Sequence, residues 1–269
     1  MALTTRDGLV AAIAGGKQVK VYKNSITAVA GIPQSLFRQG AGSPGVSTLA
    51  VPTTVGRVLT NADSGALPLP VPSGGGTCYL GQALVTMALS GVLMLGDRLV
   101  EFGGLSGIVT TAQPLSAVAL PARAGTGVGV ELWLEWYVAT GSTASAVVTA
   151  SYTNSDGTPG RTATLVGGIP VSVTAYRMYQ MSLQAGDVGV RSVESVTLGT
   201  NTLTAGSFGV TLIEPICMFG TGIANVLNVM GYAETGLPKI DPAGCLAFQA
   251  FTTTTSTGNF TAALNIISG

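Results

Sequence analysis

The stretch that decides the fold class is residues 128–138, which read Val-Gly-Val-Glu-Leu-Trp-Leu-Glu-Trp-Tyr-Val. Its side chains alternate: the even positions from 130 to 136 are all apolar or aromatic, and the odd positions carry Glu131, Trp133, Glu135 and Tyr137. A period of two residues is the signature of a β-strand, because successive side chains point to opposite faces. Residues 259–267 alternate in the same way. Both segments are therefore predicted to be strands.

Working outward from these two segments, further strands are predicted wherever Thr- and Val-rich runs lie between glycine turns. The predicted ranges are 18–23, 79–89, 92–100, 108–111, 144–153, 161–166, 179–183, 190–198, 207–213 and 245–254. Residues 154–160 form the turn of one hairpin, where the Asp156-Gly157 step supplies the positive φ that a hairpin loop needs. Strands with little helix between them indicate an all-β protein, an antiparallel β-sandwich of jelly-roll type.

The first 76 residues differ in texture from the rest. They are rich in glycine, proline and alanine, which break regular elements at this density. We expect residues 1–76 to form an extended N-terminal arm with a short helix, capped by Thr4 or Thr5, and a strand, and residues 77–269 to form the sandwich body. Asp7 and Gly8 interrupt the opening, so no secretory signal is expected, and residues 85–95 are too short to span a bilayer.

The charge content excludes several function classes. The chain has 269 residues with 12 basic and 12 acidic side chains, no histidine and a charged fraction of 9%, against roughly 25% in an ordinary soluble domain. A neutral chain offers no broad basic footprint for nucleic acid, and without histidine neither an imidazole base nor a histidine-ligated zinc is possible. A monomer of this mass would expose roughly 10,000–11,000 Å², on the order of 450 Å² per charge. We expect that surface to be covered by other chains.

Glu131 and Glu135 are the pair to test for catalysis, since they share a strand face with Trp133 between them. Four residues of strand separate their Cα atoms by about 13 Å. Retaining glycosidases hold two carboxyls at about 5–5.5 Å and inverting ones at about 6.5–9.5 Å, so the spacing argues against this chemistry. We expect cross-strand pairing with Arg161 or Arg191 instead. A carbohydrate-binding sandwich that uses these three residues is a remote alternative.

Two further motifs have ordinary structural explanations. Residues 154–156 resemble a calcium loop but lack its third acidic ligand and its distant Glu, so a turn is expected. The glycines at 125, 127 and 129 precede a strand, whereas a dinucleotide loop follows one. No catalytic residue, cofactor or metal site is therefore predicted.

The lysines and the cysteines complete the candidate residues. Lys17, Lys20 and Lys23 surround a short strand and are expected on a solvated face, with contact to an acidic patch of a partner as the alternative. Cys78, Cys217 and Cys245 are few and far apart, and buried free thiols are expected.

Several stretches resemble a group of virion proteins in tailed bacteriophages. They are residues 3–13, 21–26, 33–38, 152–161, 189–197 and 237–246. The resemblance implies a non-enzymatic structural role as a capsid decoration (cement) protein, located in the virion and assembled in the host cytoplasm. It implies self-association, for which we expect a trimer, and contact with the major capsid protein, and it transfers no catalytic residue. A tail or tail-tube component is the alternative.

Overall fold

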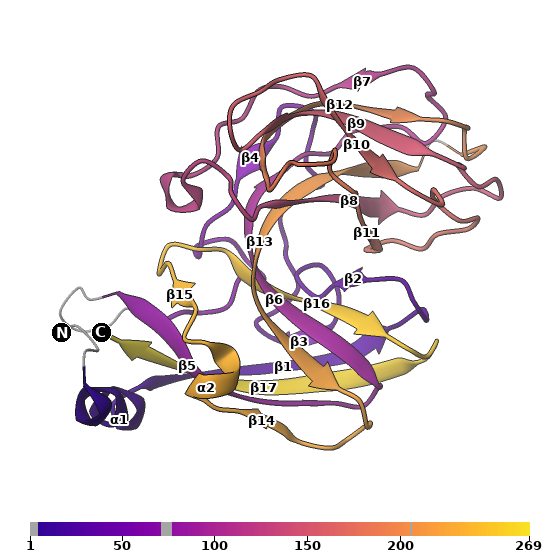
Figure 1. The fold of residues 1–269 in the computed structure, drawn as a ribbon. Helices are drawn as coiled ribbons and strands as arrows, with labels where there is room; N and C mark the ends of the chain where they lie inside the picture. Colours follow the sequence, from indigo (N-terminus) through magenta and orange to yellow (C-terminus); the bar gives the residue numbers. More distant parts are fainter. Residues whose placement is uncertain (1–4, 71–76, 205) are drawn as a thin grey trace. The chain divides into compact units, whose positions relative to one another are not determined.

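The computed structural model describes residues 5–70, 77–204 and 206–269. Its contacts divide the chain into two compact units, coloured by sequence in Figure 1. Unit 1 comprises Met1–Thr48, Thr60–Asp97 and Ile216–Gly269, and unit 2 comprises Leu49–Leu59 and Arg98–Pro215. The regular elements of the described residues are almost all strands, and the strand pairs with a stated register are antiparallel. The predicted all-β, sandwich-like fold with a short helix near its start is confirmed.

The elements are numbered along the chain. Unit 1 holds α1 (Arg6–Ala14), β1 (Lys17–Thr27), β2 (Gln34–Ser35), β3 (Ala41–Ser43), β5 (Cys78–Met87), β14 (Asn228–Met230), α2 (Tyr232–Thr235), β15 (Lys239–Ile240), β16 (Leu246–Thr252) and β17 (Thr257–Ser268). Unit 2 holds β4 (Arg57–Val58), β7 (Gln113–Pro114), the 3-10 turn η1 (Ala122–Ala124), β8 (Glu131–Val138), β9 (Val148–Asn154), β10 (Arg161–Leu165), β11 (Met178–Gln180) and β12 (Val190–Leu198). Strands β6 (Gly91–Glu101) and β13 (Ser207–Thr221) contribute residues to both units.

The main sheet of unit 1 has the strand order β14-β5-β17-β1-β3, and β15 also pairs with β5. Its register aligns side chains of one kind across neighbouring strands. Val21 of β1 lies opposite Ala262 of β17, which lies opposite Val85 of β5, and all three are buried. Because side chains alternate along each strand, the residues on either side of this row point to the opposite, outer face.

The core of unit 1 lies between this sheet and the strands β6 and β16. In the β6–β16 pair, Leu95 lies opposite Phe248, and both are buried. The Phe248 ring packs edge-on against Phe260 of β17, with ring centroids 4.8 Å apart, and the ring centroid of Phe219 lies 6.0 Å from that of Phe248. These aromatic contacts join the two layers, and burial of such rings is a large part of what stabilises a sandwich.

Unit 2 contains the sheet β10-β9-β12-β7 and a second group in which β8 pairs with β11 and β13. Figure 1 draws β8 and β11 beneath β9, β10 and β12. Trp136 of β8 stacks on Phe208 of β13, with ring centroids 4.5 Å apart. Both tryptophans of the chain, Trp133 and Trp136, are buried in this unit.

Two local predictions, the helix cap and the hairpin turn, are confirmed by the structure, and one predicted strand is wrong. Thr5 caps α1, because its hydroxyl oxygen accepts a hydrogen bond from the Gly8 amide at 3.1 Å, as one of the two predicted caps would. Gly157 adopts φ 84° in the β9–β10 hairpin, as predicted. The strand predicted at residues 108–111 is wrong: Ile108 lies in a turn that follows Ser106 and is exposed, so this segment has no neighbouring strand to pair with.

The contacts divide the chain elsewhere than at the boundary expected after residue 76. Strand β1 follows α1 directly and pairs with β17 over most of its length and with β3 on its other edge. Its inward side chains Val19, Val21 and Ile26 belong to the same core as β5 and β17. Residues from both sides of position 76 therefore build unit 1.

Candidate interaction surface

The pair Glu131 and Glu135 does not form a site. Glu135 is fully buried, and so is Trp133, at 1% exposure. Glu131 is partly exposed and accepts a hydrogen bond from Trp133 Nε1 at 2.9 Å. Burial raises the pKa of Glu131, although hydrogen bonds from Trp133 and Gln180 act in the opposite direction. A carbohydrate surface built on these three residues is thus contradicted, because a buried ring cannot stack on a sugar.

Glu135 belongs to a buried ionic network, and the prediction of Arg161 or Arg191 as its partner is wrong. Its carboxylate accepts hydrogen bonds from Arg98 Nη2 and from the Thr211 hydroxyl, the latter at 2.8 Å. Arg98 also reaches Glu101 at 3.3 Å, and Arg57 Nε donates to Glu101 at 2.7 Å. Burial by itself lowers the pKa of Arg98, but the carboxylates of Glu135 and Glu101 outweigh it and raise that pKa above its ordinary value.

Arg161 pairs with Asp187 instead, at one end of the β9–β10 hairpin. Its Nε and Nη2 atoms donate to the two carboxylate oxygens of Asp187 at 2.8 and 2.9 Å. The Tyr152 hydroxyl and Asn154 Nδ2 donate to the same carboxylate, Asn154 at 2.8 Å. Hydrogen bonding by Arg161, followed by that of Tyr152, holds the pKa of Asp187 well below its ordinary value.

The segment that resembles a calcium loop is a turn, as predicted. The side-chain oxygen of Asn154 accepts a hydrogen bond from the Thr158 amide at 2.9 Å, and its amide nitrogen is engaged by Asp187. Asp156 is exposed at the tip. In the part of the chain that the structure describes, no group of three His, Cys, Asp or Glu residues could hold a metal ion.

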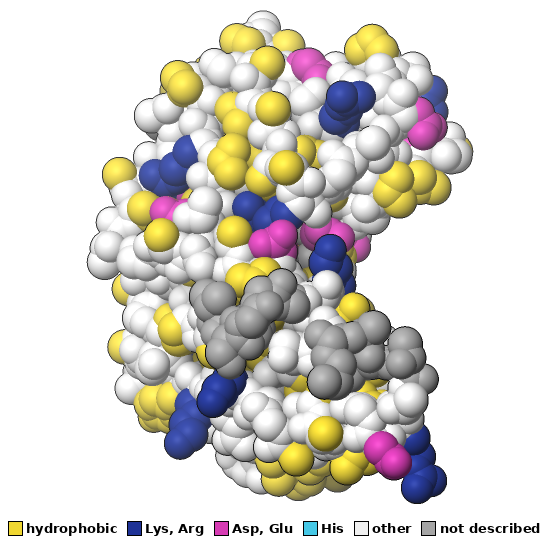
Figure 2. Space-filling model, turned by 90° about the vertical axis from the view of Figure 1, so that its left-hand side faces the viewer, with side chains coloured by type: hydrophobic (Ala, Val, Ile, Leu, Met, Phe, Trp, Pro, Cys, Tyr) yellow, Lys and Arg dark blue, Asp and Glu magenta, His cyan; other side chains and the backbone are white. Residues whose placement is uncertain are grey.

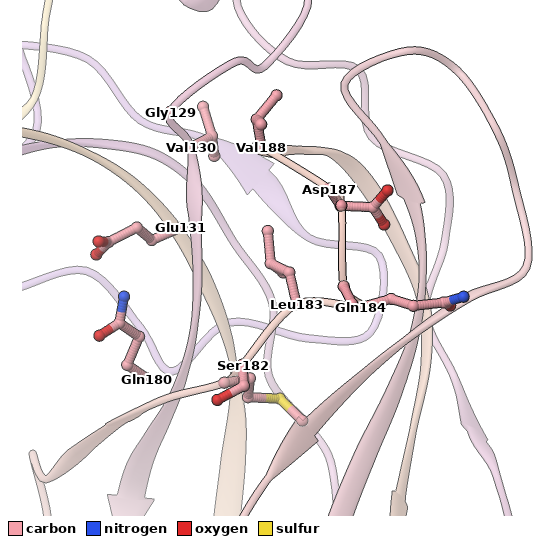
Figure 3. Close-up of a pocket in the computed structure, with 12 residues that line it drawn as sticks. Gly129, Val130, Glu131, Gln180, Ser182, Leu183, Gln184, Asp187 and Val188 are labelled. Carbon is pink, nitrogen blue, oxygen red and sulfur yellow. The ribbon is translucent and has the colours of Figure 1, made fainter.

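A pocket of about 570 Å³ lies beside the hydrogen-bond network of Asp187, between residues 129–131 and 180–188. Its polar side chains do not converge: Figure 3 shows Glu131 and Gln180 on one side of Leu183, and Gln184 and Asp187 on the other. Asp187 is saturated by its partners, and the side-chain oxygen of Gln184 accepts from the Thr162 amide at 3.1 Å. The pocket therefore lacks a nucleophile–base pair around a common point, which acid–base chemistry requires.

The glycines at 125–129 serve backbone packing. Residue Val128 forms a β-bridge with Gly189, and the Gly129 amide donates to the Val188 carbonyl oxygen at 2.8 Å. A Cβ on Gly127 would lie 2.2 Å from the carbonyl oxygen of Val190. This close approach requires glycine at position 127.

The lysines do not share one face. Lys17 and Lys20 are exposed, whereas Lys23 is buried and its Nζ donates to the Gly45 carbonyl oxygen at 2.9 Å. Burial lowers the pKa of Lys23 to about 8. The expectation that all three are solvated is wrong for Lys23, because its odd position directs it inward with Val19 and Val21. All four lysines of the chain lie in unit 1.

The cysteines are free thiols, as expected. Cys78 and Cys245 are buried, and Cys217 is only partly so. Burial raises the pKa of Cys78 and of Cys217, which keeps both thiols protonated and unreactive near neutral pH.

The outer face of the main sheet of unit 1 carries one shallow groove of about 350 Å³, which we call the outer-face groove. Two rows of paired residues form its floor: Leu84–Ala263–Lys20 and Thr86–Thr261–Tyr22. Leu227 and Ser43 complete the rim. Its lining is predominantly apolar, and Lys20 is its only charged member.

An exposed apolar segment adjoins this groove around β14. Its large side chains are more than a third exposed: Met218, Ile223, Val226, Leu227, Val229 and Tyr232. Val229 lies opposite Leu84 in the β14–β5 pair and therefore shares the outer face with it. A surface cluster of this composition is typical of contact with another protein.

Helix α1 is a second surface without a covering partner. From Leu9 to Ala14 every residue is apolar, yet none is buried, and Val10 is 59% exposed. The helix contacts β17, where Asn265 Nδ2 donates to the Ile13 carbonyl oxygen at 3.0 Å. The described residues contain no helix long and apolar enough to cross a membrane.

The surface of both units is poorer in charge than the composition alone indicates. Seven of the 24 charged side chains are buried, which leaves 17 for the surface: the buried ones are Lys23, Arg38, Asp97, Arg98, Glu101, Glu135 and Arg177. On the face drawn in Figure 2, charged side chains stand as small groups among uncharged and hydrophobic ones.

Comparisons with known proteins leave the chain without an assigned family. No protein-family profile and no curated protein matches it. Among solved structures, a mutant VP2 protein of infectious bursal disease virus in derived T=1 particles is similar at 9% identity, over 94% of this chain and 77% of that one, with a TM-score of 0.19. The infectious bursal disease virus Gx strain structure gives 10% identity, 94% and 81% coverage and a TM-score of 0.17. Scores this low carry no argument about fold or function.

Proposed function

We propose that this chain is a non-enzymatic structural protein of a virus particle, and specifically a capsid decoration (cement) protein of a tailed bacteriophage. It associates with copies of itself, as a trimer, and with the major capsid protein. It uses no cofactor and binds neither nucleic acid nor membrane. The single observation that carries the proposal is a surface left with 17 charged side chains while helix α1 and the segment around β14 expose apolar residues.

The physical argument starts from what such a surface does in water. Burying apolar area stabilises a contact by roughly 25 cal/mol per Å². One copy that covers a modest area binds weakly, but a shell holds many copies, and each additional contact of an attached copy is intramolecular. Summed contacts of this kind would reinforce a shell against internal pressure without any catalytic group.

The hydrogen bonds of two acids support the non-enzymatic part of the proposal. Glu135 is held by Arg98 and Thr211, and Asp187 is held by Arg161, Tyr152 and Asn154. A carboxylate that already accepts charge-assisted hydrogen bonds is stabilised as an anion, which makes it a poor general acid or base near neutral pH.

The test is to quantify the chain in purified particles by mass spectrometry against the major capsid protein. A near-stoichiometric amount supports a decoration protein. A few copies per particle overturn the shell role in favour of a tail component, and absence from the particle overturns the proposal altogether.

A second experiment tests the stabilising role directly. Particles that lack the chain are heated with and without the purified protein, and release of the genome is followed with a dye. A rise in the release temperature that saturates with added protein is the expected result, and an unchanged temperature contradicts the role.

A further inference from the structure

Helix α1 is too short and too exposed to be stabilised by its own unit alone. Helices of nine residues are marginal in water, since nucleation consumes most of what so few hydrogen bonds contribute. The residues Gly8, Leu9, Ala12 and Ile13 are partly covered and face the sheet, whereas Arg6, Asp7, Val10, Ala11 and Ala14 are exposed. The exposed set recurs with helical spacing, so it forms one outward stripe with Val10 at its centre.

The outward stripe of α1 and the outer-face groove are complementary in polarity, and the stripe carries one acidic side chain, Asp7, beside the basic Arg6 at its N-terminal end. Val10 and the alanines beside it are apolar, as is most of the groove lining. Asp7 lies three residues before Val10 on the same stripe, and Lys20 is the one charged residue of the groove. A helix with Val10 in the groove can therefore place its single acidic side chain against the single basic one.

The helix does not occupy the groove of its own chain. The groove is lined by β1, β3, β5, β17 and Leu227, and Tyr22 remains 44% exposed within it. Only Gly15 and Gly16 connect α1 to β1, and the bond from Asn265 to Ile13 anchors the helix where Asn265 pairs with Gln18. Gln18 and Tyr22 are about 13 Å apart along the strand. Figure 1 shows α1 near the start of β1 and the end of β17.

We propose that α1 of one copy docks into the outer-face groove of a second copy, with Val10 in the groove and Asp7 against Lys20. The inference rests on the proposed function in that it requires self-association. Because helix and groove are different surfaces, the contact is heterologous and propagates from copy to copy until a ring closes. Two copies that exchange helices already close such a ring, and three copies close the trimer of the proposed function.

The size of the contact indicates how the assembly is held. A helix of nine residues is about 13.5 Å long, so one junction covers far less than the roughly 800 Å² per partner of a standard interface. A single junction is weak, and ring closure, which adds one intramolecular junction, stabilises the assembly. Assembly is therefore expected to be cooperative and dependent on protein concentration.

The first experiment is a charge exchange, measured by sedimentation velocity on the full chain over a hundredfold concentration range. Asp7→Lys and Lys20→Glu are each expected to raise the concentration for half-assembly about tenfold, and the double variant to restore it. Lys239→Glu is the matched control, since Lys239 is exposed on β15 and does not line the groove. Loss of assembly in the control equal to that in Lys20→Glu, or no recovery in the double variant, overturns the pairing.

The second experiment separates a head-to-tail contact from a symmetric one. Val10→Asp disables the helix and Leu84→Asp disables the groove, and each variant alone is expected to be monomeric with unchanged tryptophan fluorescence. An equimolar mixture retains one intact junction, so it is expected to form heterodimers and nothing larger. If both variants assemble like the unmodified chain, the docking mode is overturned while self-association stands. If the unmodified chain is monomeric throughout, the proposed function falls with it.

Discussion

Replacing Arg98 with methionine removes a buried cation that contacts two buried carboxylates. Arg98 is 2% exposed and its Nη2 atom contacts Glu101, Glu135 and Thr211. Glu101 keeps its bond from Arg57, and Glu135 keeps its bond from the Thr211 hydroxyl but loses the charge of Arg98. Breaking a buried ion pair by removing one partner destabilises a protein by about 3–5 kcal/mol, a large part of the 5–15 kcal/mol that holds a typical domain together.

The assay is thermal and urea unfolding of Arg98→Met followed by tryptophan fluorescence, which reports unit 2 because both tryptophans are buried there. The midpoint temperature is expected to fall by roughly 10–20 °C. The difference from the unmodified protein shrinks as the pH falls toward 5, because the Glu135 carboxyl, once it has lost the charge of Arg98, then takes up a proton.

Two matched variants make this prediction decisive. Arg191→Met removes an exposed arginine of the same unit and is expected to change the free energy of unfolding by less than about 0.5 kcal/mol. The double variant Arg98→Met with Glu135→Gln replaces both charges and is expected to recover most of the loss. A loss below about 1 kcal/mol in Arg98→Met, or a double variant no more stable than the single one, refutes the argument.

Three further substitutions test other parts of the fold. Lys23→Met removes a buried amine whose pKa is lowered to about 8. Because the unfolded chain binds this proton more tightly, the free energy of unfolding of the unmodified protein is expected to rise by on the order of 2 kcal/mol between pH 7 and pH 10, and that of the variant is not. Urea unfolding followed by circular dichroism at both pH values measures this rise, and parallel pH profiles for the two proteins would contradict it. Asp187→Asn removes a carboxylate whose pKa is held below its ordinary value. This carboxylate stabilises the folded protein above about pH 4 and stops doing so in acid, and the variant is expected to lack that contribution. Acid titration followed by fluorescence checks this, and an unchanged acid midpoint counts against it. Gly168→Ala places a Cβ 1.8 Å from a backbone oxygen, whereas the Cβ of Gly167→Ala meets open space at a similarly positive φ. The first substitution is expected to lower the free energy of unfolding of unit 2 by at least 2 kcal/mol more than the second. Equal unfolding midpoints for the two variants would show that the backbone relaxes.

The alternation of side chains predicted the strands well, because it depends only on which neighbours a residue has in sequence. It locates β8 and β17, and it places Lys20 and Lys23 on opposite faces of β1 once the strand is extended to include both. The partner of each strand depends instead on residues far along the chain. Strand β1 pairs with β17, more than 200 residues later, and no local pattern indicates this.

The candidate surface could be predicted only in part for the same reason. Scarce charge indicated a covered surface, and Thr5 with the apolar run behind it indicated a short helix. The groove required the register of three strands, which brings Leu84, Ala263 and Lys20 into one row. The sequence predicted Arg161 or Arg191, both on strands between residues 144 and 198, as the partner of Glu135. The actual partner, Arg98, lies on β6, and no local pattern indicates that β6 approaches Glu135.

The confinement of lysine to unit 1 has a practical consequence for anyone who attaches this protein to a solid support. Amine coupling reaches Lys17, Lys20 and Lys239 and tethers the molecule by that unit alone, next to the groove. A biosensor chip prepared this way leaves unit 2 without lysine linkages. A ligand of the outer-face groove is expected to bind to the immobilised protein only when the protein is linked through another position, for example through an engineered thiol in unit 2.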